Sequence, residues 1–176
     1  MKKTLVSAAL ATVFLTFGAN AADQGQGKVF FKGSVINAPC GIAPESADQS
    51  IDFGQISKAH LEANGISEKK DLDIKLVNCT FEKELLKTVK VTFSGTHAAH
   101  VNNELGTTGD TGTAIVISSA DGTLVNFDGA TASGTTKLKA GDNTLHYTSW
   151  VKKSASGGTL KEGAFTAVTN FNLTYE

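Results

Sequence analysis

The amino-acid sequence predicts an exported, all-β domain with an immunoglobulin-like sandwich architecture. Three observations support this prediction: a basic and then apolar N-terminus, one isolated pair of cysteines, and short alternating runs separated by turn residues. The chain has 176 residues, which suits one domain with a substantial core. Its 18 glycines against 2 prolines favour strands that are joined by turns.

The first residues have the order of a secretory signal peptide. Lys2 and Lys3 precede an uncharged apolar run from Leu5 to Phe17, and Ala19-Asn20-Ala21 has the small–x–small pattern of a cleavage site. We therefore expect a signal peptide over residues 1–21. The alternative is a retained membrane anchor, which the short apolar run disfavours.

Cys40 and Cys79 are the only cysteines. In an exported chain an isolated pair predicts one structural disulfide. Closing a loop of about 40 residues would stabilise the fold by roughly 4 kcal/mol. A metal or redox site is the alternative, but the pair has no CxxC spacing and no neighbouring histidine pair.

Several segments have the period of strands, and one has the signals of a helix. Asp71 to Thr80 places Leu72, Ile74 and Leu76 on one face. The other expected strand segments are Ser50 to Ile56, Val89 to Phe93, Ala114 to Ile117 and Leu145 to Val151, with shorter pieces at Leu124, Asn126-Phe127 and Leu138. Ser57 to Ala63 is the expected short helix, with Ser57 as its N-cap. Glu82 to Lys90 could be a loop or one helical turn, and Gly106 to Gly112 is a polar connection.

Neither end of the mature chain has an obvious partner. Near the start, Val29, Phe31, Gly33 and Val35 alternate as one strand face. Near the end, the segment from Gly163 to Glu176 places its apolar residues on one face, namely Phe165, Ala167, Phe171, Leu173 and Tyr175. Such a terminal strand needs a neighbour on each side, or it is an adhesive edge. The simpler alternative is an ordinary first strand with a bulge at Gly33, and a last strand paired within its own sheet.

No residue grouping predicts catalysis, a metal or a cofactor. The four histidines are scattered, and His97 and His100 fall in a stretch that looks like a loop. No GxSxG motif is present, so a periplasmic hydrolase is disfavoured. Asp71 and Asp73 are best explained as a solvated outer strand face. With 16 basic and 17 acidic residues and no basic patch, nucleic acid is not an expected partner.

In order along the chain, several segments resemble the major rod subunits of chaperone–usher fimbriae, most closely those of P pili. These segments are Gln26-Gly27-Lys28-Val29 to Cys40, Ser46 to Gln55, Asp71-Leu72-Asp73-Ile74, Leu76-Val77-Asn78-Cys79 and Leu145-His146-Tyr147-Thr148. The resemblance also includes Gly163, fourteen places from the end, and the penultimate Tyr175. The segment from Phe81 to Lys87 fits less well.

The resemblance implies an incomplete sandwich that lacks its seventh strand and is completed in trans by a donor strand. Residues 22–36 would be the donor extension and residues 37–176 the pilin domain. A groove beside the last strand, with Gly163, Phe165, Phe171, Leu173 and Tyr175, would bind a periplasmic chaperone and then the next subunit, with Val29, Phe31, Gly33 and Val35 facing inward. We count six firm strands where a complete sandwich needs seven.

The same resemblance implies partners and a location. Identical subunits, an outer-membrane usher, and the adaptor and tip subunits of the same fimbria would be the partners, and the product would be an adhesive organelle on the bacterial surface, reached through the periplasm. The alternative function is a minor or tip subunit, or a carbohydrate-binding adhesin module with its site near Trp150 or the His97–Asn103 stretch.

Overall fold

The computed structural model describes residues 26–82 and 87–176. Along the sequence the chain divides into two units, and the boundary falls between Val35 and Ile36. The expected signal peptide lies outside the described residues, as does the middle of the Glu82–Lys90 segment. In the described part, no helix is long and apolar enough to cross a membrane.

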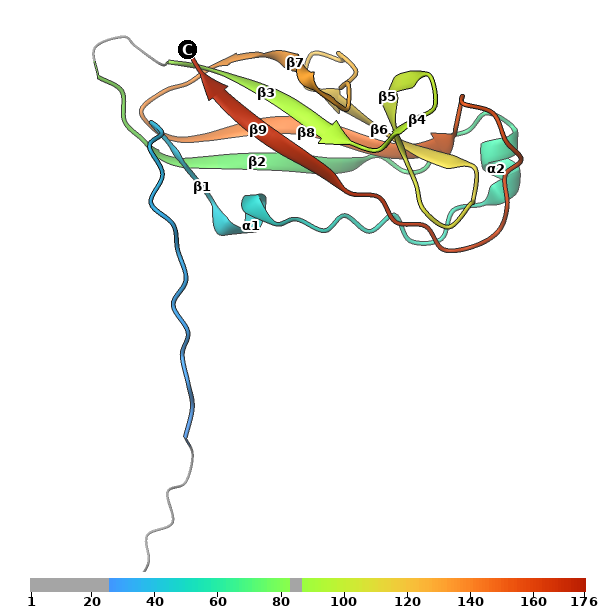
Figure 1. Ribbon diagram of the computed structural model, residues 1–176, viewed down its shortest axis with the longest axis horizontal. Helices are drawn as coiled ribbons and strands as arrows, with labels where there is room; N and C mark the ends of the chain where they lie inside the picture. Colours follow the sequence, from blue (N-terminus) through green and yellow to red (C-terminus); the bar gives the residue numbers. More distant parts are fainter. Residues whose placement is uncertain (1–25, 83–86) are drawn as a thin grey trace, which may run out of the picture. The chain divides into compact units, whose positions relative to one another are not determined.

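The second unit is built from two antiparallel sheets (Figure 1). The larger sheet has the order β1-β2-β8-β6-β5-β4, with β1 at Gly41–Ile42, β2 at Lys70–Cys79, β8 at Gly141–Lys153, β6 at Thr113–Ser119, β5 at Val101–Gly106 and β4 at His97–Ala98. The smaller sheet has the order β7-β3-β9, with β7 at Asp128–Lys137, β3 at Thr88–Gly95 and β9 at Thr169–Tyr175. The described part of the domain also has two short helices, α1 at Pro44–Ala47 and α2 at Lys58–Glu62. The predicted all-β sandwich is therefore confirmed.

The core lies between the two sheets and is formed by the alternating faces that the sequence predicts. Strand β2 buries Leu72, Ile74 and Leu76, and its register with β8 pairs Leu72 with Tyr147. On the outer face of the same ladder Asp73 Oδ1 lies 2.8 Å from His146 Nδ1, which confirms the solvated-face interpretation of this aspartate. From the smaller sheet, Phe93 contacts Tyr147 edge to face, with ring centroids 5.2 Å apart.

The helix that the sequence predicts is present as α2. The side chain of Ser57 accepts a hydrogen bond from the backbone N–H of His60 at 3.4 Å, which satisfies one of the free donors of the first turn. The positive φ of 63° at Asn64 ends the helix. The capping residues at the two ends of α2 were thus sufficient to predict this helix from the sequence.

Several predictions about strands were wrong, and the piece expected at Leu138 also lies outside any strand. The segment from Ser50 to Ile56 belongs to no strand, although Ile51 and Phe53 are half-buried at alternate positions. Residues 125–127 are not a strand, and Leu124 makes only an isolated bridge to Ser118. The polar Asp128–Lys137 is strand β7 instead, because backbone pairing to β3 holds it while most of its side chains stay exposed. The stretch of His97 and His100 is likewise no simple loop, since it contains β4 and leads into β5.

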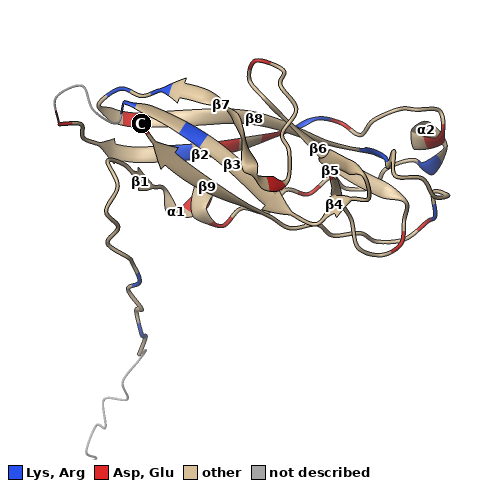
Figure 2. Cartoon of the chain, turned by 45° about the horizontal axis from the view of Figure 1, so that its top comes forward, with Lys and Arg blue, Asp and Glu red and all other residues tan. Residues whose placement is uncertain are grey.

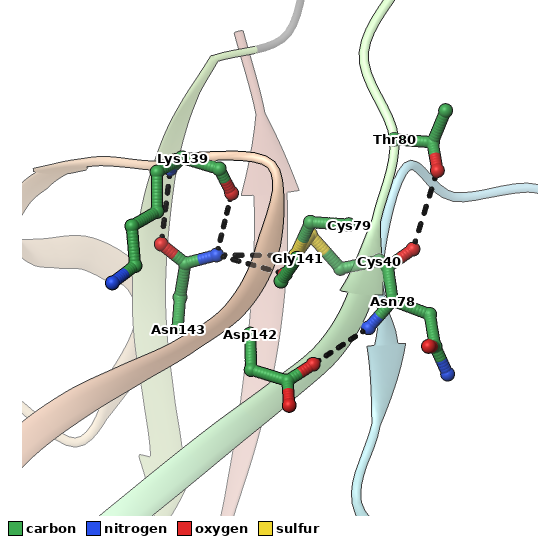
Figure 3. Close-up of a disulfide and its surroundings, with 8 residues drawn as sticks. All are labelled: Cys40, Asn78, Cys79, Thr80, Lys139, Gly141, Asp142 and Asn143. Atoms are coloured by element: carbon green, nitrogen blue, oxygen red, sulfur yellow. Dashed lines mark hydrogen bonds between the residues drawn. A yellow bond between two sulfur atoms is a disulfide. The ribbon is translucent and has the colours of Figure 1, made fainter.

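A disulfide joins Cys40 to Cys79 and ties the residues that follow the extension to the end of β2 (Figure 3). Both cysteines are buried, at 2% and 3% exposure. The backbone N–H of Thr80 donates to the carbonyl of Pro39 at 2.9 Å, and Asn143 Nδ2 lies 3.4 Å from Cys79 Sγ. The disulfide is therefore buried, and it links the first residues of the domain to the end of β2.

Candidate functional site

Strand β9 has one paired edge and one free edge among the described residues. It pairs with β3 alone. Thr88 and Glu176 exchange both backbone hydrogen bonds, at 3.0 and 2.9 Å. Because such pairs recur at every second residue of an antiparallel ladder, the backbone N–H and C=O groups of Phe171, Leu173 and Tyr175 point toward the free edge. This edge can accept a further strand.

The inner face of β9 and of the segment before it is only half covered. Phe165, Ala167, Phe171, Leu173 and Tyr175 alternate with exposed residues, and each is intermediate in exposure. The matching inner residues of the neighbouring strand β3 are 1–2% exposed. Four of these side chains pack against the main core cluster, from Ala167 to Tyr175. The structure therefore brings the predicted residues of this face together. Their side chains pack on the core on one side and remain partly exposed to solvent on the other.

The opposite wall is the segment of residues 49–56 between α1 and α2, which runs beside β9 and the coil that precedes it (Figure 1). Ile51, Phe53 and Ile56 are its half-buried residues. No backbone–backbone hydrogen bond joins this segment to any other described part of the chain. The sequence predicted a strand from Ser50 to Ile56 because its side chains alternate, but none of the described strands pairs with it.

Three cavities lie in line between these two walls. The first, of about 150 Å³, lies between Phe53 and Ala167, with a floor that includes Leu105, Ile115 and Ile117. The second, of about 220 Å³, lies between residues 51–54 and 163–165. The third, of about 710 Å³, extends past α2 and residues 160–165. We call the space that these walls enclose the open groove.

The loop of residues 107–112 contacts residues 161–166 beside the largest of the three cavities of the open groove. The backbone N–H of Thr108 donates to the carbonyl of Thr166 at 2.8 Å. Gly109 has a φ of +84°, and a Cβ at this position would collide with the carbonyl oxygen of Ala164. Lys161 forms an ion pair with Asp110. The sequence predicted only a polar connection from Gly106 to Gly112, because nothing local indicates the distant segment that this loop contacts.

A polar atom without a partner lies at the C-terminal end of β9. The hydroxyl oxygen of Tyr175 is buried and makes no hydrogen bond within the described structure. Burial also raises the pKa of this phenol above its ordinary value of 10.0. An unpaired buried hydroxyl is costly, so this site is incomplete in the isolated subunit.

Residues 26–36 join neither sheet, so they are not an ordinary first strand. Three of the apolar side chains at the predicted donor positions are largely exposed: Val29 at 75%, Phe31 at 92% and Val35 at 103%. A Cβ at Gly33 would meet nothing within 4 Å, so no bulge explains this glycine. Val29, Phe31 and Val35 thus form an apolar face that is exposed in the described structure.

The other candidate residues make local contacts within the domain. In the described ranges no group of three or more histidine, cysteine or acidic side chains could hold a metal. His97 Nδ1 contacts the backbone carbonyl of Ala98 at 3.1 Å. Lys69 Nζ lies 4.9 Å from the ring centroid of Trp150 and covers that face of the indole. Figure 2 shows charged residues scattered over the domain, with none inside β9.

Comparisons with known proteins agree along nearly the whole chain. The family model described as "Fimbrial protein" matches residues 29–176. The chain is 52% identical over 187 residues to the KS71A fimbrillin of Escherichia coli, with all of both chains covered. It is 55% identical to the PRS fimbrial major pilin protein of the same species, over 90% of this chain and 100% of that one.

Solved structures agree as well. A structure of a chaperone–usher pilus matches with a TM-score of 0.80 and 52% identity, over 87% of this chain and 97% of that one. The P pilus rod subunit PapA matches with a TM-score of 0.74 and 51% identity, over 79% of this chain and 100% of that one.

Proposed function

This chain belongs to the fimbrial protein family, and we propose that it builds the rod of a chaperone–usher fimbria by filling the open groove of each subunit with residues 22–36 of the next. It is a major structural subunit, assembled through the periplasm onto the cell surface, and its relatives are structural subunits of the same kind. The observation that carries the proposal is the combination of an open groove and the exposed apolar side chains of Val29, Phe31 and Val35 in one chain.

The chemistry of the joint is strand addition. The free backbone groups of β9 supply hydrogen bonds of about 0.5–1.5 kcal/mol each to an incoming strand. Burying Val29, Phe31 and Val35, which are exposed in the subunit, contributes roughly 1.5–3 kcal/mol for each side chain. Ordering the extension offsets part of this gain. Slow unfolding of the pairing therefore keeps the fibre intact.

A periplasmic chaperone is required before assembly. The open groove exposes apolar core and a free strand edge, which together would cause aggregation. We expect the chaperone to cover β9 until an outer-membrane usher delivers the subunit to the growing rod, whose far end carries adaptor and tip subunits. Deleting the chain from Phe171 onward should remove this binding edge and abolish accumulation in the periplasm. Full-yield co-purification of a co-expressed chaperone with that truncation would contradict the assignment.

The main experiment removes the donor and keeps the groove. In cells that express the fimbrial assembly genes, deletion of residues 26–35 should leave the subunit exported and chaperone-bound but should abolish surface fibres in electron micrographs. Lys32→Ser is the matched control, because Lys32 is exposed and alternates with the apolar series. Fibres of normal length from the deletion would refute the proposed function.

A further inference from the structure

Two exposed aliphatic side chains are not explained by the apolar lining of the open groove. Val168 is 76% exposed, and its neighbours Ala167 and Thr169 line the groove. Ile36 is 54% exposed and follows Val35, the last inward residue of the extension. By strand alternation, both would lie on the outer face of a filled groove. The positions of Ile36 and Val168 in the joint between two subunits depend on the direction and register of the extension.

The direction follows from the two walls. Residues 49–56 run opposite to β9, since Gly54 and Gln55 lie near residues 160–165 while Gln49 lies near Thr169. An incoming strand can therefore be antiparallel to only one wall. Strand β9 is regular, whereas the other wall includes Gly54 with a φ of +62°. Antiparallel pairing is the more stable per residue, so the extension should run antiparallel to β9.

The register follows from matching the two inward series. The extension has four inward positions from Val29 to Val35, and β9 has four from Thr169 to Tyr175. Antiparallel alignment of these series places Gly33 opposite Phe171. The ring of Phe171 packs on Phe93 at a centroid distance of 6.4 Å. The position without a side chain thus meets an aromatic ring.

The same alignment brings the two unexplained residues together. With Gly33 opposite Phe171, Ile36 lies opposite Val168, and the other outer residues of β9 are the exposed Asn170, Asn172 and Thr174. We propose that Ile36 of the incoming subunit packs on Val168 of the accepting subunit and fixes the register of the joint. This inference rests on the proposed function. A slip of two residues keeps every inward side chain inward, so inner alternation alone does not exclude it. Such a slip would place Ile36 beside Thr166 or Asn170 and lose the contact.

A cysteine pair tests the contact directly. Even-numbered residues of β9 bond to β3, so Val168 and Ile36 would form a non-hydrogen-bonded pair, with Cα atoms about 4.5 Å apart. That spacing suits a disulfide. Fibres of the double variant Ile36→Cys, Val168→Cys should give covalent ladders on boiled, non-reducing gels. Phe30→Cys with Val168→Cys is the matched control, because the proposed register places Phe30 opposite Thr174, six residues from Val168. Ladders from the control pair, or none from the first pair in normal fibres, would overturn the inference.

A charge exchange provides a second measurement that needs no new cysteine. Ile36→Lys and Val168→Glu should each shorten the lifetime of fibres in detergent by about two- to fivefold, and the double variant should restore it. Failure of the double variant to recover would refute the contact. The deletion of residues 26–35 separates this failure from that of the proposed function: if fibres require these residues but the pair neither links nor rescues, only the register is wrong.

Discussion

Replacing Gly33 by asparagine should separate the folding of the subunit from its polymerisation. In the subunit a Cβ at this position meets nothing within 4 Å, so the variant should fold, be exported and bind the chaperone normally. In the joint the new side chain would face the ring of Phe171, which already packs against the core. The substitution therefore acts only when one subunit fills the groove of another.

The expected magnitude comes from two costs at this position. Overpacking a formed core costs about 1–3 kcal/mol. Burying an amide without hydrogen-bond partners adds about 1–3 kcal/mol. Even the lower total, about 2 kcal/mol, corresponds to a roughly 30-fold weaker joint, because 1.4 kcal/mol is a factor of ten. Insertion of the Gly33→Asn extension should therefore be reduced by at least this factor.

The assay mixes chaperone-bound subunits and follows the appearance of ladders on unboiled gels. Gly27→Asn is the matched control, since Gly27 also has open space around it and would lie beyond the end of β9 in the proposed register. The control should ladder at the normal rate. If Gly33→Asn also ladders at that rate, the donor role of this glycine is wrong. If Gly33→Asn never reaches the periplasm, a folding role within the subunit is favoured instead.

Three further predictions concern the extension, the disulfide and a buried carboxylate. Phe31→Ala should leave the melting temperature of the subunit unchanged, because the ring is 92% exposed, but should weaken the joint by about 3–5 kcal/mol if the ring is buried there, measured as fibre dissociation in denaturant. Replacing Cys40 and Cys79 by serine should lower the periplasmic yield and the melting temperature of the chaperone complex, and unchanged values for both would count against a structural role. Glu104 is buried, and although burial raises its pKa, hydrogen bonds from Lys152, Ser154 and the Ala155 amide outweigh that effect and hold the pKa below 4.5. Because the pKa of Glu104 is lower in the folded state, its carboxylate stabilises the fold above the ordinary pKa, and this contribution is lost as the pH falls through the lowered value. The free energy of unfolding, measured with denaturant, should therefore decline below about pH 4.5, and the decline should be smaller in Glu104→Gln.

Elements whose signals are local could be predicted from the sequence. The alternation in β2 and β8 identified both strands, and the Ser57 cap identified α2. The polar β7 was missed because its partner β3 supplies the stabilising backbone bonds while its own side chains face solvent. The alternating side chains of Ser50 to Ile56 predicted a strand, but a strand also needs a backbone partner.

The sequence alone predicted an export signal and determined the cysteine pair, the alternating face of each principal strand, and the two apolar ends that carry the resemblance to fimbrial subunits. Only the tertiary structure decided that residues 49–56 and β9 enclose an open groove, that the 107–112 loop holds one end of it, and that Val168 lies exposed beside it. The physical reason is that side-chain periodicity reports which face a residue turns to the core. Which backbone edge stays unpaired depends on where distant segments meet.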